Sequence, residues 1–179
     1  MRNSGLHMLR DQSARPNIRA RSPSRVHSRA VIGAVLLGGV VAGTIDIGAA
    51  CLINGRSVPF ILRSIAGGVL GERSFTGGAP TAMLGLLLQE AMGILIAAIY
   101  VLASEHLAAL RRRWVLCGLC YGAVIFVVMN YVVVPLSTWH VVPHFSAWTL
   151  TGNLAAMFLF GLIVAYFARR PVGTRPGAA

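Results

Sequence analysis

Residues 114–134 read WVLCGLCYGAVIFVVMNYVVV and contain no acidic or basic side chain. The stretch directly follows Arg111-Arg112-Arg113 and is followed by Pro135. A helix needs about 20 consecutive apolar residues to cross the hydrocarbon core of a bilayer. The 21 residues of this stretch therefore predict a membrane-spanning helix that starts beside the three arginines and closes at Pro135.

Three further stretches share this length and character. They cover residues 30–53, 80–103 and 148–167. Together with residues 114–134 they predict an all-α, integral membrane four-helix bundle, formed by a membrane domain over residues 30–168.

The composition of the whole chain agrees with this plan. Of the 179 residues, 56% are hydrophobic and 12% are charged, and the mean hydropathy is +0.71. Soluble domains carry about 25% charged residues, so soluble, disordered and coiled-coil classes are excluded. The length excludes a large transporter, because four spans use most of the residues between the polar tails.

The charge is strongly positive, and its placement predicts the topology. The net charge is +11, and all 16 basic residues are arginine. Thirteen of the 16 lie in residues 1–29, 111–113 and 169–179, which four spans place on one side of the membrane. Because cytoplasmic segments carry the excess of basic residues, the N- and C-termini are both predicted to be cytoplasmic. This distribution follows membrane loops, so we expect no nucleic-acid partner.

Two segments outside the spans have a character of their own. Residues 1–29 are rich in Arg and Ser and predict a disordered cytoplasmic tail. Residues 58–71 are apolar but too short to span, so they predict a short interfacial or re-entrant helix at the outer membrane surface. Ser57 is its expected N-cap, and Gly67-Gly68 and Gly77-Gly78 are expected to break or end it.

Small residues recur at a spacing of four in every predicted span. Such pairs let helix backbones approach closely in lipid, where packing drives helix association. The expected packing residues are Gly39 and Gly43 in the first span and Gly118 and Gly122 in the third, with Gly93/Ala97 and Gly161/Ala165 in the other two. The pattern fits packing within one chain and packing between copies in a homo-oligomer.

Each predicted span also carries a polar side chain in its outer half, and together these form a candidate intramembrane cluster: Asp46, Glu90, Asn130 and Asn153. Asp46 lies 16 residues into its span, about 24 Å from the start at 1.5 Å per residue. An ionisable side chain at such depth is costly and indicates a functional site by default. In a functional interpretation the acids line a polar pocket that exchanges protons or binds a cation or polar solute. In a structural one they are neutral, or paired with Arg56 or Arg63, and hydrogen bonds lock the bundle.

Gln89 precedes Glu90 and points about 100° away around the helix. We therefore expect Gln89 and Glu90 to face two different interfaces. Arg56, Arg63 and Arg73, near glycine-rich backbone, are candidate contacts to lipid head groups.

Cysteine and histidine predict no disulfide framework, metal site or cofactor. Cys117 and Cys120 form a C-x-x-C pair in the third span, but beside the arginines it lies at the cytoplasmic end, where thiols stay reduced. His140 and His144 are four residues apart, yet Pro143 opposes a helix between them and no acidic or thiol ligand is close in sequence.

Several short motifs in residues 40–165 resemble an uncharacterised family of short four-span bacterial inner-membrane proteins and, more distantly, the YagU-like membrane proteins. These motifs are Gly43-Thr-Ile-Asp46, Ile65-Ala-Gly-Gly-Val-Leu-Gly71, Phe75-Thr-Gly-Gly78, Tyr121-Gly122, Met129-Asn130 and Val134-Pro-Leu-Ser137. The resemblance implies a multi-pass protein of the bacterial inner (plasma) membrane. It carries no catalytic residue over to this chain.

The sequence therefore predicts a non-enzymatic structural or accessory membrane component that binds lipid or a membrane partner, including a second copy of itself. A small transporter or proton-coupled permeation unit built on the intramembrane cluster is the alternative. A membrane thiol redox protein that uses Cys117 and Cys120 is the third hypothesis.

Overall fold

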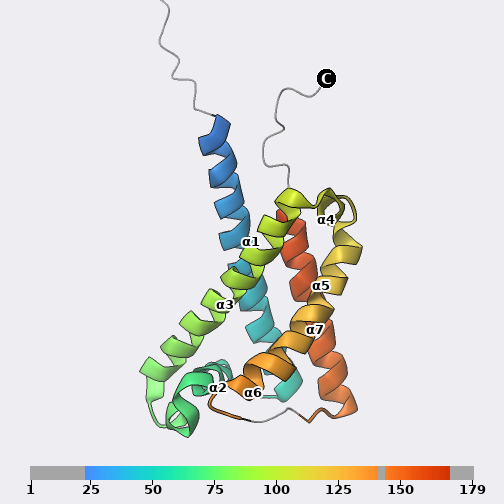
Figure 1. Ribbon diagram of the computed structural model, residues 1–179. Helices are drawn as coiled ribbons and strands as arrows, with labels where there is room; N and C mark the ends of the chain where they lie inside the picture. Colours follow the sequence, from blue (N-terminus) through green and yellow to red (C-terminus); the bar gives the residue numbers. More distant parts are fainter. Residues whose placement is uncertain (1–22, 141–143, 170–179) are drawn as a thin grey trace, which may run out of the picture.

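The computed structural model describes residues 23–140 and 144–169, and this part of the chain is helical without any strand (Figure 1). The α-helices are α1 (Pro23–Asn54), α2 (Val58–Leu70), α3 (Gly78–His106), α4 (Ala108–Arg112), α5 (Trp114–Val128), α6 (Val134–Leu136) and α7 (Ala147–Ala168). A 3-10 helix, η1 (Gly71–Phe75), follows α2, and a π-helix, η2 (Met129–Val133), joins α5 to α6.

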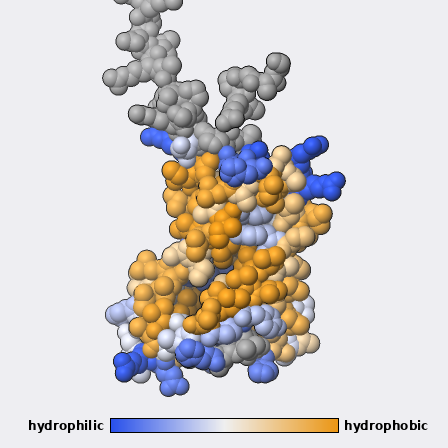
Figure 2. Space-filling model, viewed as in Figure 1, coloured by the Kyte–Doolittle hydropathy of each residue, from blue (hydrophilic) through white to orange (hydrophobic). Residues whose placement is uncertain are grey.

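Four helical segments are long and apolar enough to cross a membrane: Ser28–Asn54, Gly78–His106, Trp114–Leu136 and Ala147–Ala168. The shortest has 22 residues and is about 33 Å long at 1.5 Å per residue, which exceeds the hydrocarbon thickness of about 30 Å. On the face shown in Figure 2, a belt of mostly apolar residues crosses the middle of the molecule, and hydrophilic residues gather toward its two ends. The predicted all-α, four-span membrane fold is confirmed.

Two predicted boundaries need correction. Helix α1 begins at Pro23, so residues 23–29 are helical and do not belong to a disordered tail; proline is well tolerated in the first turn of a helix, and no breaker follows it. The third span continues through Pro135 to Leu136. The missing N–H of proline is tolerated here because Pro135 lies in the first turn of a new helical segment, just after the wider π-helix. Residues 1–22 and 170–179, predicted as tails, lie outside the described residues.

The four spans are arranged around the pair α1 and α7. Helix α1 packs against α3 on one side and α7 on the other, and α7 packs against α5. The described start of α1, the end of α7 and helix α4 lie at one end of the molecule, while α2 and α6 lie at the other (Figure 1).

Close backbone contacts at glycine fix the crossing points of the helices. A Cβ added at Gly39 of α1 would lie 2.6 Å from the Cα of Ile94 on α3, and one at Gly93 would lie 2.8 Å from the carbonyl oxygen of Gly39. Likewise, a Cβ at Gly161 of α7 would lie 2.8 Å from the backbone nitrogen of Gly122 on α5. The small residues expected to pack helices therefore meet in pairs within one chain.

The core occupies the half of the molecule that carries α4 and the described chain ends, which we name the closed half. Its buried residues are Ala42, Ala97, Tyr100, Val101, Ile125, Phe160, Val164, Ala165 and Ala168. Helices α3 and α5 meet there directly, because the Tyr121 hydroxyl donates a 2.7 Å hydrogen bond to the Ile96 carbonyl and the rings of Tyr100 and Tyr121 lie 4.9 Å apart.

In the other half, the open half, α3 and the η2–α6 end of the third span are separated by a pocket that both of them line. Helices α1 and α7 stay together there, since the Trp148 indole donates a 3.3 Å hydrogen bond to the Ile53 carbonyl. Helix α2 packs against α3 at this end, and its buried face includes Ile61, Leu62 and Ala66. This arrangement leaves space between α3 and the third span that side chains of the four spans do not fill.

Candidate functional site

A pocket of about 680 Å³ opens in the open half, between α2, α3 and the end of the third span. In the space-filling view the surface is hollowed between the α3 side and the α5–α6 side (Figure 2). The lining residues come from the end of α1 (Ala50, Asn54), from α2 (Phe60, Ile61, Ser64, Ile65, Gly68, Val69), from α3 (Leu88, Gln89, Met92), from η2 and α6 (Met129, Val133, Val134), and from Arg56, Ser137 and Trp139. Most of this wall is apolar.

Three polar side chains of the wall donate hydrogen bonds to backbone carbonyls of their own helical segment. The Asn54 amide donates to the Ala50 carbonyl at 2.8 Å, and the Ser64 hydroxyl donates to the Phe60 carbonyl at 3.0 Å. Ser137 likewise donates to the Val134 carbonyl at 2.6 Å. The donors of these side chains are therefore already used within the protein, and the surface that the pocket offers to a ligand is mainly apolar.

Arg56 is the cation of the pocket. It is exposed, and its guanidinium carbon lies 4.9 Å from the centre of the Phe60 ring, within cation–π distance. Among the described residues it forms no ion pair. An apolar cavity with one cation suits an amphiphile with an anionic head.

A three-residue loop after α6 attaches the third span to α2. Thr138 donates its backbone N–H to the Gly68 carbonyl at 3.0 Å and its hydroxyl to the Gly67 carbonyl, and it accepts a hydrogen bond from the Gly71 N–H at 3.2 Å. The Trp139 indole donates to the Ser64 carbonyl at 3.3 Å. These bonds close one side of the pocket.

Helix α2 begins after Ser57 as predicted, but neither Gly67-Gly68 nor Gly77-Gly78 ends it, and the expectation that they break or end the helix is wrong. Ser57 precedes the first residue, and Gly71 at φ 63° follows the last. The helix, however, runs through Gly67-Gly68 without a break. Gly67 is needed because the Trp139 ring lies against its backbone, where a Cβ would overlap it.

The two predicted intramembrane acids lie in the seam between α1 and α3. The Gln89 amide donates a 2.9 Å hydrogen bond to the Asp46 carboxylate, and the Thr44 hydroxyl donates a 3.2 Å hydrogen bond to the Glu90 carboxylate. The second oxygen of Glu90 is buried without a hydrogen-bond partner in the described chain. The carboxylate lies over Gly43, whose missing side chain makes room for it.

The expectation that Gln89 and Glu90 face different interfaces is wrong. Both side chains reach α1, where Glu90 accepts a hydrogen bond from Thr44 and Gln89 donates one to Asp46. Gln89 lines the pocket as well. It therefore links the pocket to Asp46. In the described chain neither acid forms an ion pair with Arg56 or Arg63.

Asn130 and Asn153, the other two members of the predicted cluster, form their hydrogen bonds within their own helices and not across the seam. Asn130, in the π-helix, donates to the Phe126 carbonyl at 2.9 Å, and Asn153 donates to the Thr149 carbonyl at 2.7 Å. Both bonds run to the previous turn of the same helix. The polar residues that meet across helices are therefore the acids with Thr44 and Gln89.

Of the three arginines predicted to contact lipid, Arg56 alone lines the pocket. Arg63 on α2 is half-buried, and its Nε donates no hydrogen bond within the described chain. Arg73 in η1 is exposed. The three cysteines are free thiols, and the described residues contain no group of three His, Cys, Asp or Glu side chains placed to hold a metal ion.

Sequence reasoning missed the pocket itself and placed neither Gln89 nor Trp139 in a candidate site. Gln89 had a usable signal, since a second polar side chain stands beside Glu90 within an apolar span. Trp139 was assigned no partner, because its contact with Gly67 joins residues 72 positions apart in the chain. No family model, curated protein or solved structure matches this chain.

Proposed function

We propose that this protein is a non-enzymatic component of the bacterial inner membrane that binds a membrane lipid in the pocket of the open half. One apolar chain of the lipid occupies the cavity, and an anionic head lies at Arg56. The observation that carries the proposal is the apolar pocket of about 680 Å³ with a single arginine in its lining.

The size of the pocket supports one chain rather than a whole lipid. Cavities of about 300–1,000 Å³ enclose ligands of drug size, which is smaller than a two-chain phospholipid. The pocket opens to the surface of an apolar belt (Figure 2), so a second chain can remain in the bilayer. Met92 and Met129 in the wall add adaptable apolar surface, which suits chains of differing shape.

Native mass spectrometry of the purified protein with added dioleoyl phosphatidylglycerol tests this proposal. Gly68→Leu places a side chain in the pocket, and a Cβ there would contact the Ser137 Cβ at 3.8 Å without a clash. Loss of space for two or three methylenes, at about 0.8 kcal/mol each, predicts binding weaker by about tenfold or more. Gly48→Leu is the matched control, because Gly48 on α1 has nothing within 4 Å of an added Cβ.

A second variant tests the head-group contact. Arg56→Gln should weaken binding of phosphatidylglycerol by about tenfold, the effect of a lost charge-assisted hydrogen bond, and should leave binding of phosphatidylcholine nearly unchanged. Arg73→Gln, which removes an exposed arginine outside the pocket, is its control. Equal affinity of the wild type, Gly68→Leu and Arg56→Gln for phosphatidylglycerol would refute the proposal.

Proton-coupled transport is the second candidate, and the Gln89–Asp46 hydrogen bond favours it. This bond connects a side chain in the pocket wall to a carboxylate within the first span, beside a second carboxylate with an unpaired oxygen. Carbodiimide labelling in membranes over a pH series distinguishes the two. Labelling of Asp46 or Glu90 that falls as pH rises would favour transport. No labelling at any pH, with the exposed Glu72 as a labelled reference, would favour a structural role for the seam.

A further inference from the structure

The closed half carries a second cationic feature that the pocket does not involve. Arg169 directly follows α7, and its guanidinium carbon lies 4.6 Å from the ring centre of Trp114 and 4.4 Å from that of Tyr166. The two rings lie 6.0 Å apart at 69° to each other. The guanidinium therefore sits over both rings, in the angle between them. We call these three residues the Arg169 cluster.

The rings restrain the guanidinium without using its hydrogen bonds. An arginine offers five N–H donors in a planar fork that matches a phosphate in a bidentate manner. Within residues 23–140 and 144–169, the Arg169 guanidinium donates no hydrogen bond and forms no ion pair. An aromatic contact of this kind lowers the entropy lost on binding, because the side chain is already held. Arg169 is thus restrained and exposed, with its donors unused.

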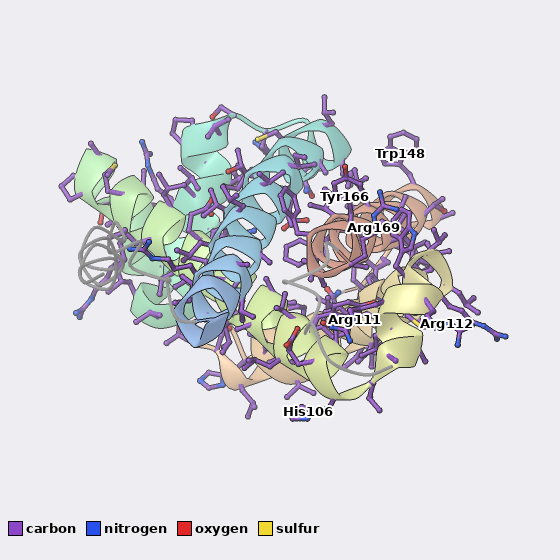
Figure 3. All side chains as sticks on the ribbon, turned by 90° about the horizontal axis from the view of Figure 1, so that it is seen from above. His106, Arg111, Arg112, Trp148, Tyr166 and Arg169 are labelled. Carbon is purple, nitrogen blue, oxygen red and sulfur yellow. The ribbon has the colours of Figure 1, made fainter. Side chains whose placement is uncertain are left out.

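Neighbouring arginines raise the positive potential around the cluster. Arg112 and Arg113 are exposed and have no ion pair in the described chain, and Arg113 precedes Trp114 directly. Arg111 differs, because it pairs with Glu105 at 3.5 Å. Seen along the bundle, Arg169 lies beside Tyr166, with Arg111 and Arg112 over the same end and His106 at its far edge (Figure 3).

The depth of the cluster points to a lipid phosphate. Trp114 is the first residue of the span Trp114–Leu136, and Arg169 comes one residue after the span Ala147–Ala168. Tryptophan and tyrosine at the ends of spans lie at the level of the lipid head groups. An arginine fixed against both rings is placed where the phosphate of a phospholipid lies.

We propose that the Arg169 cluster is a binding site for the phosphate of an anionic phospholipid, at the end of the bundle opposite the pocket. Arg169 would bind two phosphate oxygens, Trp114 and Tyr166 would keep its guanidinium in place, and Arg112 and Arg113 would attract the lipid electrostatically. The site does not depend on the pocket or on Arg56.

Titration of the full-length protein with dioleoyl phosphatidylglycerol, followed by native mass spectrometry, tests this site. A background with both Gly68→Leu and Arg56→Gln removes space in the pocket as well as its head-group contact, so that the tightest phosphatidylglycerol binding that remains reports on the closed half. Arg169→Gln in that background should weaken it by about tenfold, as expected for a lost bidentate contact. The matched control is Arg29→Gln, which removes an exposed arginine from α1 at the same end of the molecule.

Two more variants separate the cluster from general charge attraction. Arg169→Lys keeps the charge but loses the planar fork, and Tyr166→Leu keeps the arginine but removes one ring; both should weaken binding severalfold. Because Arg169 and Tyr166 are exposed, the fold should survive in each. Equal losses in Arg169→Gln and Arg29→Gln, or full binding in Arg169→Lys, would overturn the site.

A competition experiment distinguishes the phosphate of a lipid from that of a soluble phosphate ester. Glycerol phosphate carries the same head chemistry without acyl chains, and it should not displace phosphatidylglycerol at equal concentration if the site binds a lipid. Displacement by glycerol phosphate would overturn the assignment to lipid and identify a site for soluble phosphate esters.

Discussion

At the level of single residues, the absence of a side chain decides where the helices meet. Gly122 on α5 faces the backbone of α7, where a Cβ would lie 2.9 Å from the Cα of Phe158 and would overlap the Met157 carbonyl. Backbone atoms cannot move aside as the end of a flexible side chain can. In lipid, where packing replaces the hydrophobic effect as the cause of helix association, such contacts carry much of the stability.

Gly122→Ala should therefore destabilise the bundle by about 1–3 kcal/mol, the usual cost of overpacking. Thermal unfolding in detergent micelles measures it. Gly48→Ala is the control, because an added methyl group meets nothing within 4 Å, and it should be neutral or stabilising by up to about 1 kcal/mol through helix propensity. Equal stability of the two variants would contradict the role of the close contact.

The hydrogen bond between Gln89 and Asp46 predicts a measurable coupling energy between these two residues. The Gln89–Asp46 bond joins two helices at 2.9 Å, and interhelical bonds within membranes contribute about 0.6 kcal/mol on average and about 1.7 at most. A double-mutant cycle of Asp46→Ala and Gln89→Ala, read by unfolding in bicelles, should give a coupling energy in that range. The pair Thr44→Ala and Gln89→Ala, on the same two helices but without a mutual hydrogen bond, should give almost none.

The residues of the site were only partly predictable from the sequence. Asp46 and Glu90 stand out because charge is rare in a span. Their partners were not predictable, since the choice between Thr44, Gln89 and an arginine depends on how α1 and α3 are rotated. That rotation is set by the contacts at Gly39 and Gly93, which sequence spacing indicates but does not pair.

At the level of elements, the loop 137–139 determines how α2 is held. The start of α2 after Ser57 was predictable from local signals, whereas its end at Gly71 was not singled out among the several glycines of this segment. Its attachment to the third span was not, because a hydrogen bond between Thr138 and Gly67 leaves no local pattern. The π-helix before α6 also has no recognisable sequence pattern, although the nearby Pro135 marks a place where regular helix geometry is difficult.

Thr138→Val should loosen the last turn of α2. It removes the hydroxyl that donates to the Gly67 carbonyl and accepts from the Gly71 N–H. Two lost hydrogen bonds at a net cost of about 1 kcal/mol each predict amide hydrogen exchange about 30-fold faster around Gly71, measured by mass spectrometry. Thr151→Val is the control, because the Thr151 hydroxyl donates to Ala147 within α7. Unchanged exchange around Gly71 would show that the loop does not hold α2.

At the level of the whole molecule, the four helices do not form an evenly packed bundle. The contacts of Gly118 and Gly122 with Gly161 bring α5 against α7 in the closed half, and Gly39 and Gly93 bring α3 against α1. Beyond these points the pocket separates α3 from the third span, while α1 and α7 remain joined by Trp148 and Ile53. The number and length of the spans were predictable from hydropathy, but this separation was not, because it depends on which glycine pairs meet.

The positions of the arginines predict the orientation of the molecule in the membrane. The described arginines divide unequally between the ends: Arg25, Arg29, Arg111, Arg112, Arg113 and Arg169 lie with the closed half, and Arg56, Arg63 and Arg73 with the other end. The residues beyond the described range add further arginines to the tails. Basic residues are retained on the cytoplasmic side, so the closed half should face the cytoplasm.

Cysteine labelling in a bacterial host checks this direction. In a variant with Cys51, Cys117 and Cys120 replaced by alanine, Ser57→Cys should react with a membrane-impermeant maleimide in intact spheroplasts. Ala108→Cys, exposed on α4 at the other end, should react only after lysis, and labelling in detergent should reach both. The reverse pattern would place the pocket and Arg56 at the cytoplasmic side, and the Arg169 cluster would then meet the outer leaflet. Reaction of both cysteines in intact spheroplasts would mean that copies insert in both orientations, because the charge difference between the two ends is too small to fix one of them.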